Sequence, residues 1–223
     1  MPSGRGEAIF DNRQDAGRRL AEKLSDYKGQ SVIVLAIPNG GVPVALEVAG
    51  ALEAGLDLVI SRKIPIPLSP EAGFGAIADD GTIILNEVAV KSLGLSRQQI
   101  EYEAGKVRAE IKQRSLLYRG NRPLVSVSGK TVILIDDGLA SGFTMMAAVQ
   151  SVRRRRPKEI VVAVPTASAI ALKQVERVAD KVVTCVTGYM PRFAVADFYH
   201  HWYDLSDEEV VRCLNQWRTR HLR

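Results

Sequence analysis

Several features that would place a protein in a familiar class are missing from this chain of 223 residues. Its two cysteines and three histidines do not stand at the spacing of a zinc site. No apolar run approaches the roughly 18 residues of a membrane-spanning helix, and the N-terminus carries no apolar signal core. We therefore expect a cytoplasmic protein with no membrane association, in which Cys185 and Cys213 are reduced, partly buried thiols.

Two common nucleotide-binding patterns are absent as well. A Walker loop ends in Gly-Lys-Ser/Thr, whereas Gly142 is followed here by Phe143 and Thr144. The dinucleotide pattern G-x-G-x-x-G is missing, because Gly138 and Gly142 are four residues apart. The chain also has no internal repeat and no low-complexity segment. A phosphate site in this protein would therefore have to follow another pattern.

The composition is that of an ordinary globular domain, with 46% hydrophobic and 25% charged residues. The length suits a single domain over residues 1–223 and is too short for two full domains. Thirty basic against 25 acidic residues give a net charge of +5, which suits polyanionic small molecules and also permits nucleic acid. The run Arg153–Arg156 falls at a predicted helix end, where we expect a solvated cluster that complements the helix dipole.

The most informative stretch is Val132–Thr144. Its first four residues are aliphatic and bounded by turn formers, which is typical of a strand buried on both faces. Asp136 and Asp137 follow at the carboxyl end of this strand, and a loop of small and hydroxylic residues then leads into a predicted helix. Such a turn directs backbone N–H groups and a helix N-terminus at one point, which makes a seat for a phosphate dianion.

Two carboxylates beside a phosphate seat indicate a sugar phosphate. Anions repel each other, so Asp136 and Asp137 suit ribose hydroxyls or a divalent metal better than the phosphate itself. The metal contact is expected to be indirect, through ribose hydroxyls or water. The predicted phosphate-binding residues are Gly138, Leu139, Ala140, Ser141, Gly142, Phe143 and Thr144.

A second loop of the same kind lies earlier in the chain. The buried strand predicted over residues 31–37 runs into Pro38-Asn39-Gly40-Gly41 and an apolar helix, so bare backbone can approach an anion there. Arg62 and Lys63 follow the next predicted strand. Since adjacent strand residues point to opposite faces, we expect only one of this pair to face a ligand.

The order of elements predicts an α/β fold with a doubly wound parallel sheet, because near-continuous aliphatic strands alternate with helices. Ligands of such sheets bind beyond the carboxyl ends of the strands, where the strand order reverses. The loops that contain Asn39 and Asp136 are the two candidates for flanking this crevice. We further expect a turn-rich, flexible cover over residues 64–82, with a hairpin at its end, and a small hood over residues 187–223.

Taken together, the Pro38–Val42 loop, the Arg62-Lys63 pair and the Asp136–Thr144 stretch resemble the signatures of the type I phosphoribosyltransferases. The order and spacing are similar to a bacterial and archaeal branch of that family whose substrate is unassigned. The resemblance implies that ribose 5-phosphate is transferred from phosphoribosyl pyrophosphate to a nitrogenous base or related acceptor, and that pyrophosphate leaves with Mg²⁺. It also implies a homodimer, and it makes nucleic acid an unexpected partner.

The resemblance assigns roles to the matching residues. Asp136 and Asp137 would hold the ribose hydroxyls and stabilise the cationic ring through space. Amides from Gly138 to Thr144 would fix the 5′-phosphate. The metal, Asn39-Gly40-Gly41 and either Arg62 or a catalytic Lys63 would carry the pyrophosphate.

Three departures from the family pattern bear on the substrate and on the activity. Asn39 stands where the family often has a basic residue, and Ala140 stands where the members that act on 6-oxopurines carry an aspartate, which makes hypoxanthine or guanine less expected acceptors. Glu71 is then the only alternative base that we nominate. A second class stays open, a phosphoribosyl pyrophosphate sensor or nucleic-acid-binding regulator on the same fold, which Asn39 and the Arg153–Arg156 run would suit.

Overall fold

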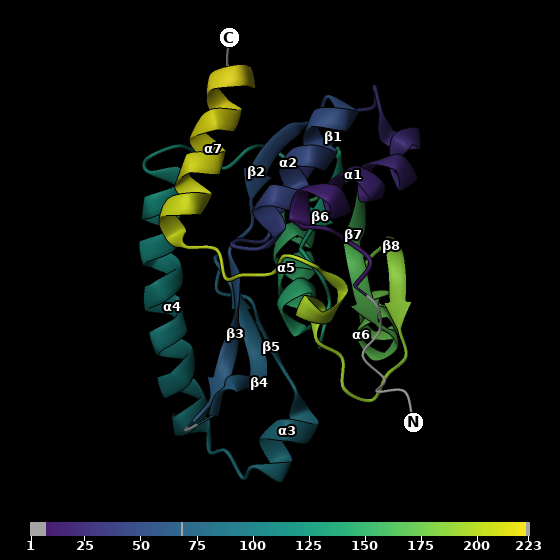
Figure 1. The fold of residues 1–223 in the computed structure, drawn as a ribbon. Helices are drawn as coiled ribbons and strands as arrows, with labels where there is room; N and C mark the ends of the chain where they lie inside the picture. Colours follow the sequence, from purple (N-terminus) through teal and green to yellow (C-terminus); the bar gives the residue numbers. More distant parts are fainter. Residues whose placement is uncertain (1–7, 68, 222–223) are drawn as a thin grey trace, which may run out of the picture.

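The computed structural model describes residues 8–67 and 69–221, apart from the side chains of residues 70, 71 and 221. Five parallel strands form a central sheet in the spatial order β2-β1-β6-β7-β8 (Figure 1). They are β1 (Val32–Ala36), β2 (Gly55–Leu58), β6 (Thr131–Ile135), β7 (Glu159–Ser168) and β8 (Lys181–Gly188). Every residue of β1 and β6 is buried, as expected for aliphatic strands covered on both faces. The predicted α/β doubly wound fold is confirmed.

Helices cover both faces of this sheet, and the two-residue period of β1 shows how the core divides. Val32, Val34 and Ala36 point into one apolar cluster with α1 (Arg13–Lys23) and α2 (Gly41–Leu52). Ile33 and Leu35 point into the other, with α5 (Phe143–Arg153) and α6 (Ala169–Val175). A short 3₁₀ turn (Ser25–Tyr27) follows α1. None of the helices in the described part of the chain is long and apolar enough to cross a membrane.

The strand order reverses between β1 and β6. From β1 the chain moves outward to β2, and on its return it places β6 on the other side of β1. The loops after β1 and β6 therefore leave the same edge of the sheet side by side, and the N–H of Ile37 donates to the carbonyl of Ile135 at 2.8 Å. This is the place where an open α/β sheet binds ligands.

A smaller antiparallel sheet projects from this edge, as the lower half of Figure 1 shows. It consists of β3 (Ser61–Ile66), β4 (Ser69–Ala78) and β5 (Ile83–Leu85), and it is followed by α3 (Glu87–Ser92) and the long α4 (Arg97–Arg119). The hairpin predicted at Asp79–Gly81 is confirmed. We call the three strands the arm.

The segment that we expected to be dominated by turns forms strands instead. Its proline residues had argued for an irregular cover, but the β3–β4 pairing shifts register on either side of Pro65, which accommodates a residue that has no N–H to donate. Whether the arm moves as a cover stays a prediction.

The two chain ends meet beside the main sheet. The N–H groups of Ile9 and Phe10 donate to the carbonyl of Phe198 at 3.0 and 2.9 Å, and the N–H of His200 donates to the carbonyl of Phe10 at 2.8 Å. A 3₁₀ turn, η2 (Val195–Phe198), precedes this pairing, and the last helix, α7 (Asp207–His221), packs on α2 and α4. The hood predicted over residues 187–223 therefore includes this paired segment, and its closing over a ligand stays a prediction.

Candidate active site

The acid pair lies at the carboxyl end of β6, and its two members face different surroundings. Asp136 lines a cavity of about 420 Å³ between the loop after β1, the arm and α4. The carboxylate of Asp137 accepts a hydrogen bond from Nε of Arg13 at 2.8 Å, within a pair whose side chains are 14% and 6% exposed. The acids therefore differ in role, since one faces open space and the other is bound by a buried cation.

Burial governs the ionisation of both acids. It raises the pKa of Asp136 well above its usual range, and the neighbouring charge of Asp137 raises it further. Burial also raises the pKa of Asp137, but the charge and hydrogen bond of Arg13 oppose that shift. Arg13 in turn stacks over the Trp202 ring at 3.9 Å and donates to the carbonyl of Tyr203 at 2.9 Å. Arg13 thus connects the N-terminal helix, the acid pair and the C-terminal segment.

The glycine pair after β1 packs directly against these acids. A Cβ at Gly40 would lie 1.9 Å from Oδ2 of Asp137, and one at Gly41 would lie 2.7 Å from the carbonyl oxygen of Ile135. Any side chain here would displace the acid loop. The sequence predicted close approach by an anion at this turn, and the anion that the structure brings there is the protein's own Asp137.

The loop between β6 and α5 is held at Leu139 and open beyond it. The N–H of Leu139 donates to the carbonyl of Thr166 at 2.9 Å, the N–H of Ser168 donates to the carbonyl of Leu139 at 2.8 Å, and the Leu139 side chain is buried. Leu139 was predicted to bind phosphate, but its N–H is already used in this pairing. Its role in the structure is to fix the loop against β7.

Helix α5 begins at the end of this loop without a cap. Its N-cap residue, Gly142, has a φ of 81°, and within the described residues no side chain bonds to the first turn of the helix. The first N–H groups of any helix lack partners inside the helix, so those of α5 are available to a ligand. The start of α2 at Gly40 also lacks a side-chain cap, but the N–H groups of Gly41 and Val42 already donate to the carbonyls of Ile37 and Asn39 at 3.1 Å, and Pro43 has no N–H. The other end of the loop is tied to the arm, because the Ser61 hydroxyl donates to the carbonyl of Thr144 at 2.9 Å.

Both Arg62 and Lys63 line the cavity, and β3 contacts both α4 and α5. The expectation that only one of the pair faces a ligand stays a prediction. Nη2 of Arg62 pairs with a carboxylate oxygen of Glu110 at 3.1 Å. Burial lowers the pKa of the Arg62 guanidinium, as does the charge of nearby Arg114.

Helix α4 adds two cations that the sequence reasoning missed. Lys106 and Arg114 line the same cavity, with Glu110 between them in the chain. These residues are four apart, which places them on one face of the helix. That spacing was the available signal, but α4 is charged over much of its surface and nothing local marked this face. The cavity lining then carries four cations against the two carboxylates of Glu110 and Asp136.

Asn39 was predicted to carry pyrophosphate as part of the Asn39-Gly40-Gly41 loop, and its side chain binds other parts of the protein. Its amide nitrogen donates to the carbonyl of Leu205 at 2.8 Å and to Oδ1 of Asp207 at 3.0 Å. Its amide oxygen accepts a hydrogen bond from Arg114 at 3.1 Å and lies 2.9 Å from the Tyr118 hydroxyl. The Pro38–Asn39 peptide bond is cis. Pro38, and not Asn39, contributes from this loop to the cavity wall.

The arginine run after α5 is occupied by contacts within the protein. Arg153 makes a bidentate pair with Asp180 at 2.7 and 3.1 Å, and Arg154 lies 3.4 Å from Asp80. Arg155 is half-buried and donates to the carbonyl of Val125. These partners fit the helix-end role that was predicted for the run. Both cysteines are free and half-buried, as expected.

The side chain of Glu71, the nominated alternative base, lies outside the part of the chain that the structure describes. Aromatic residues of the C-terminal segment pack mainly on one another, with ring centroids 5.1 Å apart for Phe193 and Phe198 and 5.2 Å apart for Tyr199 and Trp202. This arrangement favours anchoring of the segment over stacking on a ligand for the buried rings. The Tyr199 hydroxyl also donates to the carbonyl of Asp137 at 2.7 Å.

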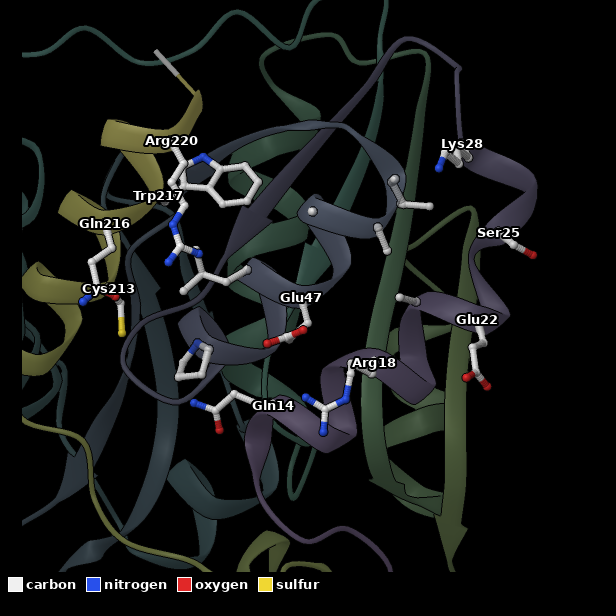
Figure 2. Close-up of a pocket in the computed structure, with 16 residues that line it drawn as sticks. Gln14, Arg18, Glu22, Ser25, Lys28, Glu47, Cys213, Gln216, Trp217 and Arg220 are labelled. Carbon is white, nitrogen blue, oxygen red and sulfur yellow. The ribbon is translucent and has the colours of Figure 1, made fainter. Parts of the chain in front are cut away.

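A larger cavity of about 710 Å³ lies elsewhere, between α1, α2 and α7 (Figure 2). Arg18 and Glu47 lie near each other on one side of it, and Trp217 and Arg220 enter from α7, as Figure 2 shows. Its lining includes no residue of the loops after β1 and β6. Although this cavity is larger, it is not the candidate active site, because it lies away from both loops.

Comparison with known proteins gives a consistent family. The sequence profile of the phosphoribosyl transferase domain matches residues 6–197. Two Mycobacterium tuberculosis proteins, from strains CDC 1551 and H37Rv, bear a provisional phosphoribosyl transferase name, and each is 38% identical to the chain over 208 residues. The matches cover 93% of this chain and 47% of each relative, so the chain spans about half the length of the curated relatives it matches.

A solved structure extends the similarity to the fold. The crystal structure of TT1426 from Thermus thermophilus is 36% identical in sequence and superposes with a TM-score of 0.76. The superposition covers 94% of this chain and 99% of that one. The likeness therefore includes the arm and the C-terminal helix as well as the central sheet.

Proposed function

Since this chain belongs to the phosphoribosyltransferase family, we propose that it transfers ribose 5-phosphate from phosphoribosyl pyrophosphate to a nitrogenous base or related acceptor and releases pyrophosphate. The family membership confirms the resemblance seen in the sequence. The activity of the chain, its acceptor and its partners belong to the proposal.

One observation carries the proposal within the structure. At the edge of the sheet where the strand order reverses, α5 begins with no cap on its first N–H groups, and the carboxylate of Asp136 lies between this start and a cationic wall. A sugar that carries a phosphate at one end and a pyrophosphate at the other needs two anion seats with a carboxylate between them. This arrangement supports phosphoribosyl pyrophosphate over a ligand with a single phosphate.

The proposed chemistry assigns a step to each group. The bond between C1 of ribose and the pyrophosphate oxygen breaks ahead of attack, so positive charge develops on the ring and negative charge on the leaving group. Asp136 would accept the ribose hydroxyls and stabilise the cationic ring, with Asp137 held behind it by Arg13. The open N–H groups at the start of α5 and the hydroxyls of Ser141 and Thr144 would hold the 5′-phosphate and so fix the direction of attack.

The leaving pyrophosphate would lie along the cationic wall. Arg62 and Lys63 line it from the arm, with Lys63 next to the leaving oxygen. The loop after β1 would add the backbone of Gly40, since the N–H of Gly41 already donates to the carbonyl of Ile37 at 3.1 Å. Charge on the leaving group grows as the bond breaks, so contacts there stabilise the transition state more than the bound substrate.

Mg²⁺ fits this donor set. Within the described residues there is no cluster of three or more histidine, cysteine, aspartate or glutamate side chains that could cage a metal. Mg²⁺ commonly binds through one or two carboxylates, water and the phosphates of its substrate, so a full protein cage is not required. Asp136 and Asp137, acting through ribose hydroxyls or water, would hold the ion, which when bound neutralises charge on the pyrophosphate.

The acceptor is proposed only as a nitrogen nucleophile. Ala140 supplies no side-chain base, so an acceptor that must lose a proton needs another group, and Glu71 is the nominee. We also propose a homodimer that works in the cytoplasm, in keeping with two free thiols.

A release assay tests the function. Pyrophosphate produced from phosphoribosyl pyrophosphate and Mg²⁺ is measured against a panel of purine, pyrimidine and simpler nitrogen acceptors, with Asp136→Asn as the inactive control. We expect release with at least one acceptor and a loss of about a hundredfold in the control.

The regulator alternative is tested alongside by titrating DNA and RNA at several salt concentrations. Salt-dependent binding without any release would favour it and contradict transfer.

A further inference from the structure

We propose that Arg114 of helix α4 supplies the cation for the leaving pyrophosphate that the loop after β1 lacks, and that Asp207, at the start of α7, positions Arg114 for this role. The proposal rests on the proposed function and names how the leaving-group side of that site is built in this chain.

The loop after β1 has no cation of its own. Position 39, at its tip, is an asparagine, and both ends of the Asn39 amide are already bonded within the protein. The loop can therefore offer pyrophosphate its backbone, but no charge. A leaving group that gains negative charge in the transition state needs a counter-charge close to this backbone.

Arg114 brings a charge to this place from a distant part of the chain. Its Nη1 donates to the amide oxygen of Asn39 at 3.1 Å, so the guanidinium lies against the tip of the loop. The side chain is 24% exposed, and it lines both the 420 Å³ cavity and an adjoining one of about 360 Å³. A guanidinium has five N–H donors, so these two protein contacts leave others for an anion.

Asp207 holds Arg114 from the other side. Its Oδ1 lies 3.2 Å from Nη2 of Arg114, and it also accepts from the amide of Asn39 at 3.0 Å and the hydroxyl of Tyr118 at 2.6 Å. Tyr118 has only one hydroxyl proton, and the shorter contact, to a carboxylate, is the one that it serves. Burial would raise the pKa of Asp207, but the hydrogen bonds from Tyr118 and Asn39 and the charge of Arg114 lower it overall, so the carboxylate is ionised at neutral pH.

This geometry fixes the guanidinium in place. Asp207 balances one charge, Arg62 is paired with Glu110 and Lys106 with Glu103 at 2.6 Å, and Lys63 also lines the cavity wall. The contacts of Arg114 to Asn39 and Asp207 use Nη1 and Nη2, one each, and hold the plane of the group in one orientation. A cation held in this way loses little conformational freedom when the anion arrives.

Direct binding tests the proposal without knowledge of the acceptor. Isothermal calorimetry with Mg²⁺ measures the affinities for pyrophosphate, phosphoribosyl pyrophosphate and ribose 5-phosphate. Arg114→Gln removes the charge but keeps a donor for Asn39, and we expect it to weaken the first two ligands by roughly tenfold to a hundredfold while ribose 5-phosphate is unchanged.

The matched control lies on the same helix. Arg108→Gln makes the same charge change at a residue that pairs with the exposed Glu101 and does not line the cavity. It should bind all three ligands as the wild type does. Arg114→Lys, which keeps the charge and loses the planar fork, should fall between the wild type and Arg114→Gln. Thermal unfolding of each variant verifies that it is folded.

The positioning role has its own readout. With any acceptor that supports release, Asp207→Asn should raise the KM for phosphoribosyl pyrophosphate several-fold with a smaller change in kcat, and Asp207→Glu should restore part of the loss. A purely structural role would lower the melting temperature and leave the KM of the folded fraction unchanged.

The outcomes separate the two proposals. Wild-type affinity for pyrophosphate in a folded Arg114→Gln variant overturns the assignment of Arg114 and leaves the proposed function standing. A wild-type protein that binds neither pyrophosphate nor phosphoribosyl pyrophosphate overturns both.

Discussion

Helices α5 and α6 begin at the same edge of the same sheet, and only one of them is open to a ligand. Each follows a parallel strand, β6 or β7, by a short connection. The start of α6 is closed by Ser168, whose hydroxyl accepts a hydrogen bond from the N–H of Ala171 at 3.1 Å. The start of α5 is at Gly142, which has no side chain to offer. A position at this edge of the sheet is therefore not enough to make an anion site. The residue at the N-cap determines whether a side chain already bonds to the first turn of the helix.

The same contrast holds over the described helices. The other described helices are closed by side chains, namely α1 by Asn12, α3 by Asn86, α4 by Ser96 with Gln99, and α7 by Ser206 with Glu209. The two that face Asp136, α2 and α5, have glycine at the cap. A side-chain cap contributes about 1 kcal/mol to stability, so the open start of α5 is a cost that the proposed phosphate binding would offset.

The largest loss of affinity is expected when a carboxylate is placed at the open start of α5, which removes the difference between open and capped helix starts. Ser141 is exposed, and Ser141→Asp should fold normally while its charge repels the 5′-phosphate. At a separation near 4 Å the repulsion amounts to about 4 kcal/mol, or about a thousandfold in affinity for phosphoribosyl pyrophosphate. Calorimetry measures it, with Ser141→Asn as the uncharged control. Unchanged affinity would mean that the phosphate binds elsewhere.

The next largest effect is expected at the carboxylate between the two starts. Asp136→Asn should lower turnover by about a hundredfold, which corresponds to about 3 kcal/mol of transition-state stabilisation. Initial rates of pyrophosphate release at saturating substrate measure this loss. Turnover that stays near the wild-type value would remove Asp136 from the mechanism.

The same variant should also change how stability depends on pH. Burial, reinforced by the charge of Asp137, raises the pKa of Asp136 above 3.8. A carboxyl with a raised pKa stabilises the fold most below its ordinary value, and that contribution is lost as the pH rises through the raised pKa. The melting temperature of Asp136→Asn, relative to that of the wild type, should therefore increase as the pH rises above 3.8. A difference between the two proteins that is constant with pH would contradict this account.

A smaller effect is expected where the start of α2 contacts the acids. Gly40→Ala places a Cβ 1.9 Å from the Asp137 carboxylate, so the loop must move. Overpacking of this kind costs about 1 to 3 kcal/mol. Urea denaturation should show that loss together with weaker binding of pyrophosphate. Gly105→Ala is the control, because its Cβ would meet nothing within 4 Å. Equal stability of the two variants would argue against the close contact.

The smallest effect is expected at a helix start that a side chain caps. Ser96→Ala removes the cap of α4, far from the acid pair, and should cost about 1 kcal/mol of unfolding free energy. Affinity for phosphoribosyl pyrophosphate should stay at the wild-type value, measured by the same calorimetry. A drop in affinity would show that the capped starts also serve the site.

The elements that the sequence predicted correctly are those specified by neighbours in the chain. The aliphatic run Val132–Ile135, the acids after it and the loop into α5 lie within a dozen residues, so their pattern is local. The capping pair Ser96 and Gln99 is a similar case. Strand alternation then implied the parallel sheet, and the order of the two loops implied the crevice.

The contacts that the sequence reasoning missed join residues far apart. Arg13 reaches Asp137 across 124 positions, and Asp207 reaches Asn39 across 168. No local pattern marks an arginine on a charged helix as a partner of a distant loop, because that depends on how helices pack on the sheet. The prolines of the arm led to a wrong prediction for the opposite reason. Proline is a local signal against a strand, but a shift in the register between β3 and β4 around Pro65 accommodates it.

The pairing of the chain ends bears on how the protein is made. Arg13 is translated before the acid loop, but the Tyr199 hydroxyl that binds the carbonyl of Asp137, and the Leu205 and Asp207 contacts of Asn39, come from residues translated after it. The acid loop therefore acquires these contacts only after the strands of the sheet have been made. A chain shortened before Tyr199 would retain the five strands of the main sheet but lose these contacts at its edge.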